Sequence, residues 1–249
     1  MKFFGHNFNV VNPPLHGHSV NGIIKSLVPG MGEHFFCADN LITWNRNLSF
    51  LQNKDFVEIV QRNSNTDVER AIIWRTYILC YFAKFAKRLE GDFVEVGAYE
   101  GNTANIIIED AKLSESGKKY FLYDAFEHTG TEENHPLPAH SPELYNRVKQ
   151  RFVGYEFVSV IKGYVPDSFA LGFPEKIAFA HVDLNQATAE VAALERILPI
   201  LVPGGVIILD DYGWWAYHQQ KQAEDPLFAR YGLEVLELPT GQGLVLNNF

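Results

Sequence analysis

The chain has 249 residues, of which 47% are hydrophobic and 20% charged, and its formal net charge is −9. A chain of this length and composition can bury a full core as one large domain, with or without an appendage. The negative charge disfavours partners that require a basic surface, namely nucleic acid and anionic membranes, and favours a small-molecule partner.

The first 65 residues are predicted to form an irregular N-terminal arm. They are rich in Asn, His, Gly and Pro, as in "NVVNPPLHGHSVNG" (9–22), and show little periodicity. We expect this arm (1–65) to act as a lid or as a subunit contact in a homodimer or higher oligomer, next to one domain over 66–249. No apolar segment typical of a signal peptide opens the sequence, and Cys37 and Cys80 lie in no metal or disulfide motif. We therefore expect a cytoplasmic protein.

A long amphipathic helix is predicted over residues 67–89. Its most apolar stretch, 71–89, is interrupted by Arg75, Lys84 and Lys87. Charges at these positions make a membrane span improbable, so we expect the helix to pack on a core.

Seven short apolar runs follow, separated mostly by segments with helix-like spacing. The runs cover 93–98, 120–126, 157–163, 177–183, 205–211, 233–239 and 243–248. This alternation predicts an α/β protein with a Rossmann-like, doubly wound, mostly parallel seven-stranded sheet. The last two runs are joined by the short turn "PTGQ", which predicts one antiparallel strand near the C-terminus.

The segment "GDFVEVGAYEGNTA" (91–104) predicts a strand, a loop and the start of a helix. Ligands bind beside such turns in doubly wound sheets. Gly97 permits a tight turn, and Gly101 permits a close approach of the helix to a ligand. The spacing differs from the G-x-G-x-x-G of dinucleotide sites. Glu95 suits a ligand with an amino group, although a tight turn without a ligand is equally compatible with this segment alone.

The next predicted strand ends at Asp124, in "YFLYDAF" (120–126). A carboxylate at this place can accept hydrogen bonds from both hydroxyls of a ribose. Phe126 is expected to flank the base. A ligand with an amino-acid end and a nucleoside end would contact both Glu95 and Asp124, and S-adenosylmethionine has that form.

Three further carboxylates follow two predicted strands, Asp183 after "AFAHV" and the pair Asp210 and Asp211 after "VIIL". The ends of neighbouring parallel strands meet at one edge of a sheet, so these acids should converge. Such a cluster needs a cation, and Mg²⁺, or alternatively Ca²⁺ or Mn²⁺, suits oxygen ligands. The alternative is that Asp210 caps the following helix while Asp211 is solvated.

From about Asp67 onward the sequence resembles the class I S-adenosylmethionine-dependent methyltransferases, and among them the macrocin O-methyltransferase family. The family motifs occur here in order as "GDFVEVGAYEGNTA", "YDAFE", "GYVPDSF", "FAHVDLN", "ILPILVPGGVIILDDYG" and "LPTGQG". The resemblance implies a metal-assisted O-methyltransferase that acts on a sugar or phenol hydroxyl in natural product biosynthesis.

The resemblance also implies roles for individual residues. Asp183, Asp210 and Asp211 would bind Mg²⁺, and Asp183 would also be catalytic. The loop from Glu95 to Asn102 would hold the methionine part of the donor, and the turn 161–163 would lie near the adenine. The full set expected at the donor is Glu95, Gly97, Ala98, Tyr99, Gly101, Asn102, Asp124, Ala125, Phe126, Gly163 and Asp183.

Residues 183–187 depart from the family pattern D-x-D-x-Y, because Asn185 replaces the second acid and Ala187 the aromatic residue. Related catechol-type enzymes often have a lysine where this chain has Gln186. The general base therefore stays open among Asp183, His128 and His218. The long polar loop at 127–145 is expected to cover the acceptor site.

Two other classes of function stay open. A non-catalytic domain that binds S-adenosylmethionine, or a scaffold, is compatible with the departures after Asp183. A nicotinamide-dependent oxidoreductase would use a similar sheet, but the missing G-x-G-x-x-G disfavours it.

Overall fold

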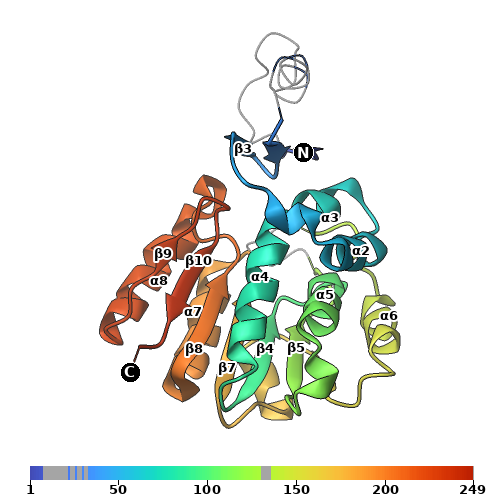
Figure 1. Cartoon of the computed structure of the whole chain (residues 1–249). Coiled ribbons are helices and arrows are strands. Elements are labelled where there is room, and N and C mark those ends of the chain that lie inside the picture. Colours follow the sequence, from blue (N-terminus) through green and yellow to red (C-terminus); the bar gives the residue numbers. More distant parts are fainter. Residues whose placement is uncertain (8–21, 23–25, 27–29, 31–32, 130–135, 249) are drawn as a thin grey trace. The chain divides into compact units, whose positions relative to one another are not determined.

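The computed structural model describes residues 1–7, 22, 26, 30, 33–129 and 136–248, and the chain divides into two compact units (Figure 1). The first unit is Met1–Tyr77 and the second is Ile78–Phe249. Most of the stretch "NVVNPPLHGHSVNG" lies outside the described residues. The fold of each unit is described separately below.

The first unit contains a small sheet within the arm that was expected to be irregular. Strand β1 (Lys2–Phe4) pairs parallel with β2 (Phe35–Ala38), which pairs antiparallel with β3 (Leu41–Trp44). The β2–β3 turn consists of Asp39 and Asn40, both with positive φ, as a tight two-residue hairpin requires. The Asp39 side chain accepts two hydrogen bonds, of 2.8 and 3.0 Å, from the buried Arg75 guanidinium.

The predicted helix over 67–89 begins where expected but is divided in two. Thr66 and Glu69 form a capping box at the start of α3 (Asp67–Ala71), which follows helix α2 (Lys54–Asn63). Ile72 leaves helical geometry, with ψ of 15°, and α4 (Ile73–Ala86) continues after it. Among the described residues, no helix is long and apolar enough to cross a membrane.

The second unit contains the predicted seven-stranded sheet, with strands in the order β6-β5-β4-β7-β8-β10-β9. All pairings from β6 to β8 are parallel, and β10 is antiparallel to both of its neighbours. The predicted fold class is therefore confirmed. The strands are β4 (Asp92–Val96), β5 (Tyr120–Asp124), β6 (Val158–Lys162), β7 (Ile177–Val182), β8 (Leu201–Leu209), β9 (Leu236–Glu237) and β10 (Gly243–Leu246).

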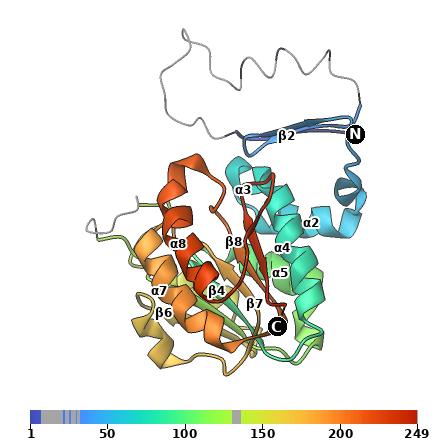
Figure 2. The same cartoon turned by 90° about the vertical axis from the view of Figure 1, so that its left-hand side faces the viewer.

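Helices cover both faces of this sheet (Figure 2). Helices α7 (Ala187–Ile197) and α8 (His218–Arg230) lie on one face, and α5 (Asn102–Ala111) lies on the other with the part of α4 from Ile78 onward. Helix α6 (Leu144–Arg151) precedes β6. One buried core joins Val94, Val96, Ala180 and Val182 to apolar side chains of α7 and α8.

This packing fixes the direction of the polar side chains in β4 and β7. Successive side chains in a strand point to opposite faces. Since Val94, Val96, Ala180 and Val182 point toward α7 and α8, Glu95 and His181 point toward the other face. Both are buried, with 1% and 2% of their surface exposed.

Candidate active site

A cavity of about 190 Å³ lies at the carboxyl ends of β4, β5, β6 and β7. Gly97 and Tyr99 follow β4, Asp124 ends β5, Gly163 follows β6 and Asp183 follows β7, and all five line the cavity. This is the edge of a doubly wound sheet at which ligands bind.

Asp124 is held by two loops that meet at its carboxylate. Its Oδ2 accepts a hydrogen bond from the Tyr99 amide (2.7 Å), and its Oδ1 accepts one from the Phe126 amide (2.5 Å). Tyr99 and Phe126 both have positive φ, so both turns aim an N–H group at the same side chain. Burial raises the pKa of Asp124, and the two amides lower it in part. Each oxygen keeps acceptor capacity for a ligand hydroxyl.

Gly97 lies where the loops after β4 and β7 touch. With φ of +93°, a Cβ atom at this position would lie 1.7 Å from the carbonyl oxygen of Asp183. The Asp183 amide in turn donates to the carbonyl of Val96 at 2.9 Å. Glycine is therefore required for backbone contact between the two loops, and this contact brings Asp183 to the cavity.

The expected donor-binding residues, all of which the structure describes, divide into two groups. Gly97, Tyr99, Asp124, Ala125, Gly163 and Asp183 line the cavity, whereas Glu95, Ala98, Gly101, Asn102 and Phe126 are not among its lining residues. Gly101 begins α5 in a left-handed conformation, and a Cβ there would meet the Phe152 ring at 2.7 Å. Packing against α6 and the residue that follows it accounts for this glycine.

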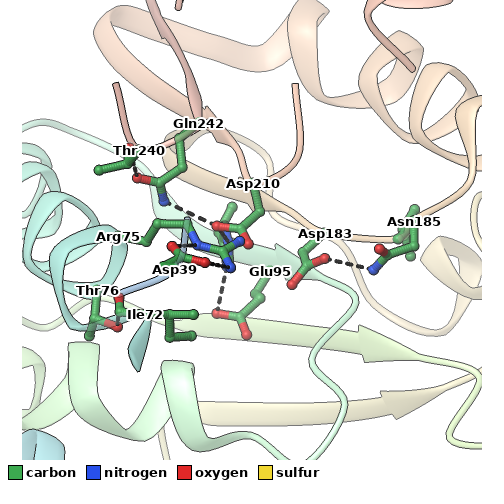
Figure 3. A network of polar contacts seen from close by, with 12 residues as sticks. Asp39, Ile72, Arg75, Thr76, Glu95, Asp183, Asn185, Asp210, Thr240 and Gln242 are labelled. Carbon is green, nitrogen blue, oxygen red and sulfur yellow. Dashed lines mark hydrogen bonds and ion pairs between the residues drawn. The ribbon is translucent and has the colours of Figure 1, made fainter. Parts of the chain in front are cut away.

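Two of the predicted metal ligands, Asp183 and Asp210, form a compact group with His181, which the sequence analysis did not select. One ligand atom from each of His181, Asp183 and Asp210 lies within 4.8 Å of the others. Figure 3 shows Glu95, Asp183 and Asp210 gathered at the ends of their strands. Asp183 also accepts a 3.0 Å hydrogen bond from the Asn185 side chain.

His181 lies between two carboxylates. Its Nδ1 is 3.5 Å from Glu95, and its Nε2 is 3.5 Å from Asp210. Burial alone would lower the pKa of His181, but Asp210 and Glu95 outweigh burial and raise this pKa to about 10. The imidazole is therefore a buried cation at neutral pH, and it neutralises part of the charge of the acids.

Hydrogen bonds extend this group across the sheet. The Tyr120 hydroxyl donates to Glu95 at 2.6 Å, and the Gln242 amide donates to Asp210 at 3.1 Å. Thr240 donates in turn to the Gln242 side-chain oxygen (Figure 3). Glu95 thus has partners within the protein, at a place that was expected to contact a ligand.

Asp211 is not a member of the group formed by His181, Asp183 and Asp210. It follows Asp210 directly, after the end of β8 at Leu209. Burial is the largest cause that raises the pKa of Glu190 on α7, and the charge of Asp211 raises this pKa further. The two adjacent carboxylates therefore lie in different environments.

The described parts of the loop at 127–145 border the cavity, while residues 130–135 lie outside the described chain. His128 and His140 line the cavity with their rings stacked at 5.9 Å, and the Tyr99 ring meets His140 edge-on at 5.4 Å. The other candidate base, His218, lies elsewhere, stacked at 5.1 Å on Trp215, which is 81% exposed.

Comparisons with known proteins agree with this architecture. Residues 94–212 match the family model of a methyltransferase domain. A search of curated proteins found no match. Among solved structures, the chain is similar to the O-methyltransferase NovP, at 16% identity over 78% of this chain and 88% of that chain, with a TM-score of 0.62.

Two other solved methyltransferase structures are also similar to this chain. The calicheamicin methyltransferase CalS11 is similar at 12% identity, over 81% of this chain and 94% of that chain, with a TM-score of 0.57. An O-methyltransferase from Bacillus cereus in complex with SAH is similar at 14% identity, over 78% of this chain and 91% of that chain, with a TM-score of 0.54. At such identities, structural similarity establishes the fold alone.

Residues 94–212 thus match a methyltransferase-domain model, and the second unit shares the fold of the solved methyltransferases. The resemblance to the macrocin O-methyltransferase family is narrower than these matches and stays a prediction.

Proposed function

We propose that this protein is an S-adenosylmethionine-dependent O-methyltransferase that methylates a hydroxyl of a small-molecule acceptor with the help of a divalent cation. The observation that carries this proposal is the cavity at the carboxyl ends of β4 to β7, which Asp124 and Asp183 line together. Asp124 lies where an acid can bind the hydroxyls of a ribose, and Asp183 follows the end of a neighbouring strand. Two such acids in one cavity suit a nucleoside-containing donor bound next to the hydroxyl that reacts.

The donor site fits S-adenosylmethionine by the chemistry of its lining. Asp124 would accept hydrogen bonds from the ribose hydroxyls, and Gly163 with its neighbours would border the adenine. Ala125 and the Gly97–Asn102 loop would border the rest of the donor. When bound, this cofactor supplies an electrophilic methyl group, and the residues of the chain bind and orient the two reactants.

Asp183 and Asp210 fit a divalent cation, since hard cations prefer carboxylate oxygens. His181 could ligate only as neutral imidazole, so its coordination would release a proton; we therefore assign the two acids as ligands. Asp211 as a third ligand stays a prediction. A bound cation would lower the pKa of the acceptor hydroxyl, and Asp183 would accept its proton.

A sugar or phenol hydroxyl is the proposed acceptor. CalS11 is described as a TDP-rhamnose 3'-O-methyltransferase, and the exposed Trp215–His218 stack offers a flat surface four residues after Asp211. The flat faces of such rings suit sugars and planar molecules.

Calorimetry with S-adenosylhomocysteine and NADH tests the donor class. We expect micromolar binding of S-adenosylhomocysteine and none of NADH; binding of NADH alone would overturn the proposal in favour of an oxidoreductase. Transfer of a radiolabelled methyl group to a panel of glycosides and phenols tests the reaction. Binding without transfer to any acceptor would favour a non-catalytic domain.

A further inference from the structure

Two glutamates meet in the interior between α7 and α8, outside the cavity. Glu190 of α7 is 3% exposed and Glu224 of α8 is 0% exposed. The Gln220 side chain, one turn before Glu224 on α8, donates a 3.1 Å hydrogen bond to Glu190, so the two carboxyl groups lie near each other. Two buried carboxylates at such a distance repel each other unless a proton lies between them.

The two carboxyl groups differ in their hydrogen-bond donors. Oε1 of Glu190 accepts hydrogen bonds from the Leu184 amide (2.9 Å) and from the Gln220 side chain (3.1 Å). Among the described residues, neither carboxyl oxygen of Glu224 has a hydrogen-bond partner. Burial raises the pKa of both groups, and the Leu184 amide lowers that of Glu190 in part.

The hydrogen bond from Leu184 connects this pair to the cavity. Leu184 directly follows Asp183, and residues 183–186 all line the cavity. Asn185 in this turn has a positive φ of 55°, a left-handed conformation that asparagine tolerates better than most residues. The Gln186 side chain makes no capping bond at the start of α7. The Oε1 atom of Glu190 therefore restrains this turn, together with the hydrogen bonds that Asp183 makes with Val96 and Asn185.

We propose that Glu190 is a positioning residue: its buried carboxyl group accepts the hydrogen bond from the Leu184 amide and so holds Asp183 and the 183–186 turn at the donor site. This inference rests on the proposed function. It differs from a second cation site, in which the negative charge of Glu190 would be essential.

The test compares S-adenosylhomocysteine affinity by calorimetry in four forms of the full chain. Glutamine keeps a side-chain oxygen that can accept from Leu184 and removes only the charge of the acid. We expect Glu190→Gln to bind within about twofold of wild type and Glu190→Ala to bind about tenfold more weakly, as loss of one buried hydrogen bond predicts. Glu195→Gln is the matched control, since Glu195 links α7 to Arg230 of α8 at the exposed surface (3.1 Å).

Affinity is measured at a temperature at which circular dichroism shows that each variant is folded. Under this condition, a loss of stability alone does not change the affinity for S-adenosylhomocysteine. Equal affinity of Glu190→Ala and wild type, or a tenfold loss in Glu190→Gln, would overturn the proposal. If Glu190→Ala does not fold, Glu190→Asp replaces it, since its shorter side chain cannot reach Leu184. Absence of binding by wild type would instead refute the proposed function.

Discussion

The imidazole of His181 lies 3.5 Å from the carboxylate of Asp210, and the two residues form a group with Asp183. The same imidazole lies 3.5 Å from Glu95. The neighbouring Asp211 adds to the effect of burial in raising the pKa of Glu190 on α7. The contact with His181 thus distinguishes Asp210, whereas a role of Asp211 as a metal ligand stays a prediction.

His181→Ala is expected to destabilise the fold. Removal of the ring would leave the buried Glu95 and Asp210 without the positive charge between them, and loss of one member of a buried ionic group costs about 3 kcal/mol. Urea denaturation at pH 7 measures the free energy of unfolding. His218→Ala, on the exposed stack with Trp215, should change it by less than about 0.5 kcal/mol. Equal values for both variants would show that His181 is not the counter-charge.

Asp124→Asn is expected to weaken S-adenosylhomocysteine binding by about 10-fold to 100-fold, because the amide loses the negative charge and one acceptor that the ribose hydroxyls require. Isothermal titration calorimetry measures the dissociation constant. Glu156→Gln removes an exposed acid just before β6 and serves as the control. Wild-type affinity in Asp124→Asn would remove Asp124 from the donor site.

The sheet was predictable because its signals are local. Each strand is a short apolar run bounded by turn residues, and the strand–helix alternation in chain order determines a parallel sheet. The β2–β3 hairpin escaped prediction because its strands have four residues each and its turn uses Asp39 and Asn40 in place of glycine. The break at Ile72 has no sequence signal either, since the apolar spacing continues through it.

The site was predictable only at strand ends. Asp124 and Asp183 reach the cavity because acids that follow parallel strands share one edge of the sheet. His181 had a signal that was not used: it lies two residues before Asp183 and therefore points to the same face. The partner of Glu95, Tyr120, depends on strand register, and spacing in the sequence does not reveal it.

Chelation by EDTA is expected to reduce methyl transfer at least tenfold, and added Mg²⁺ should restore it, if a cation assists the reaction. Asp210→Asn should reduce transfer to the same extent as EDTA, because Asp210 lies in the group with Asp183. The variant Asp211→Asn tests whether the third acid is a metal ligand. A loss of methyl transfer as large as that of Asp210→Asn would support the prediction from the sequence, and activity near wild type would refute it. Full activity of wild type in EDTA would remove the cation from the mechanism.

Glu224→Gln is expected to stabilise the protein at neutral and alkaline pH. Burial raises the pKa of Glu224 from 4.5 to about 7, so between these values the folded state binds more protons than the unfolded state. The free energy of unfolding of wild type therefore falls as pH rises from about 4.5 to 7 and stays lower above pH 7. Glutamine does not titrate, so the variant should gain about 3 kcal/mol at pH 8 and nothing at pH 4. Urea denaturation across this range measures the difference, and a gain that does not change with pH would contradict the assignment.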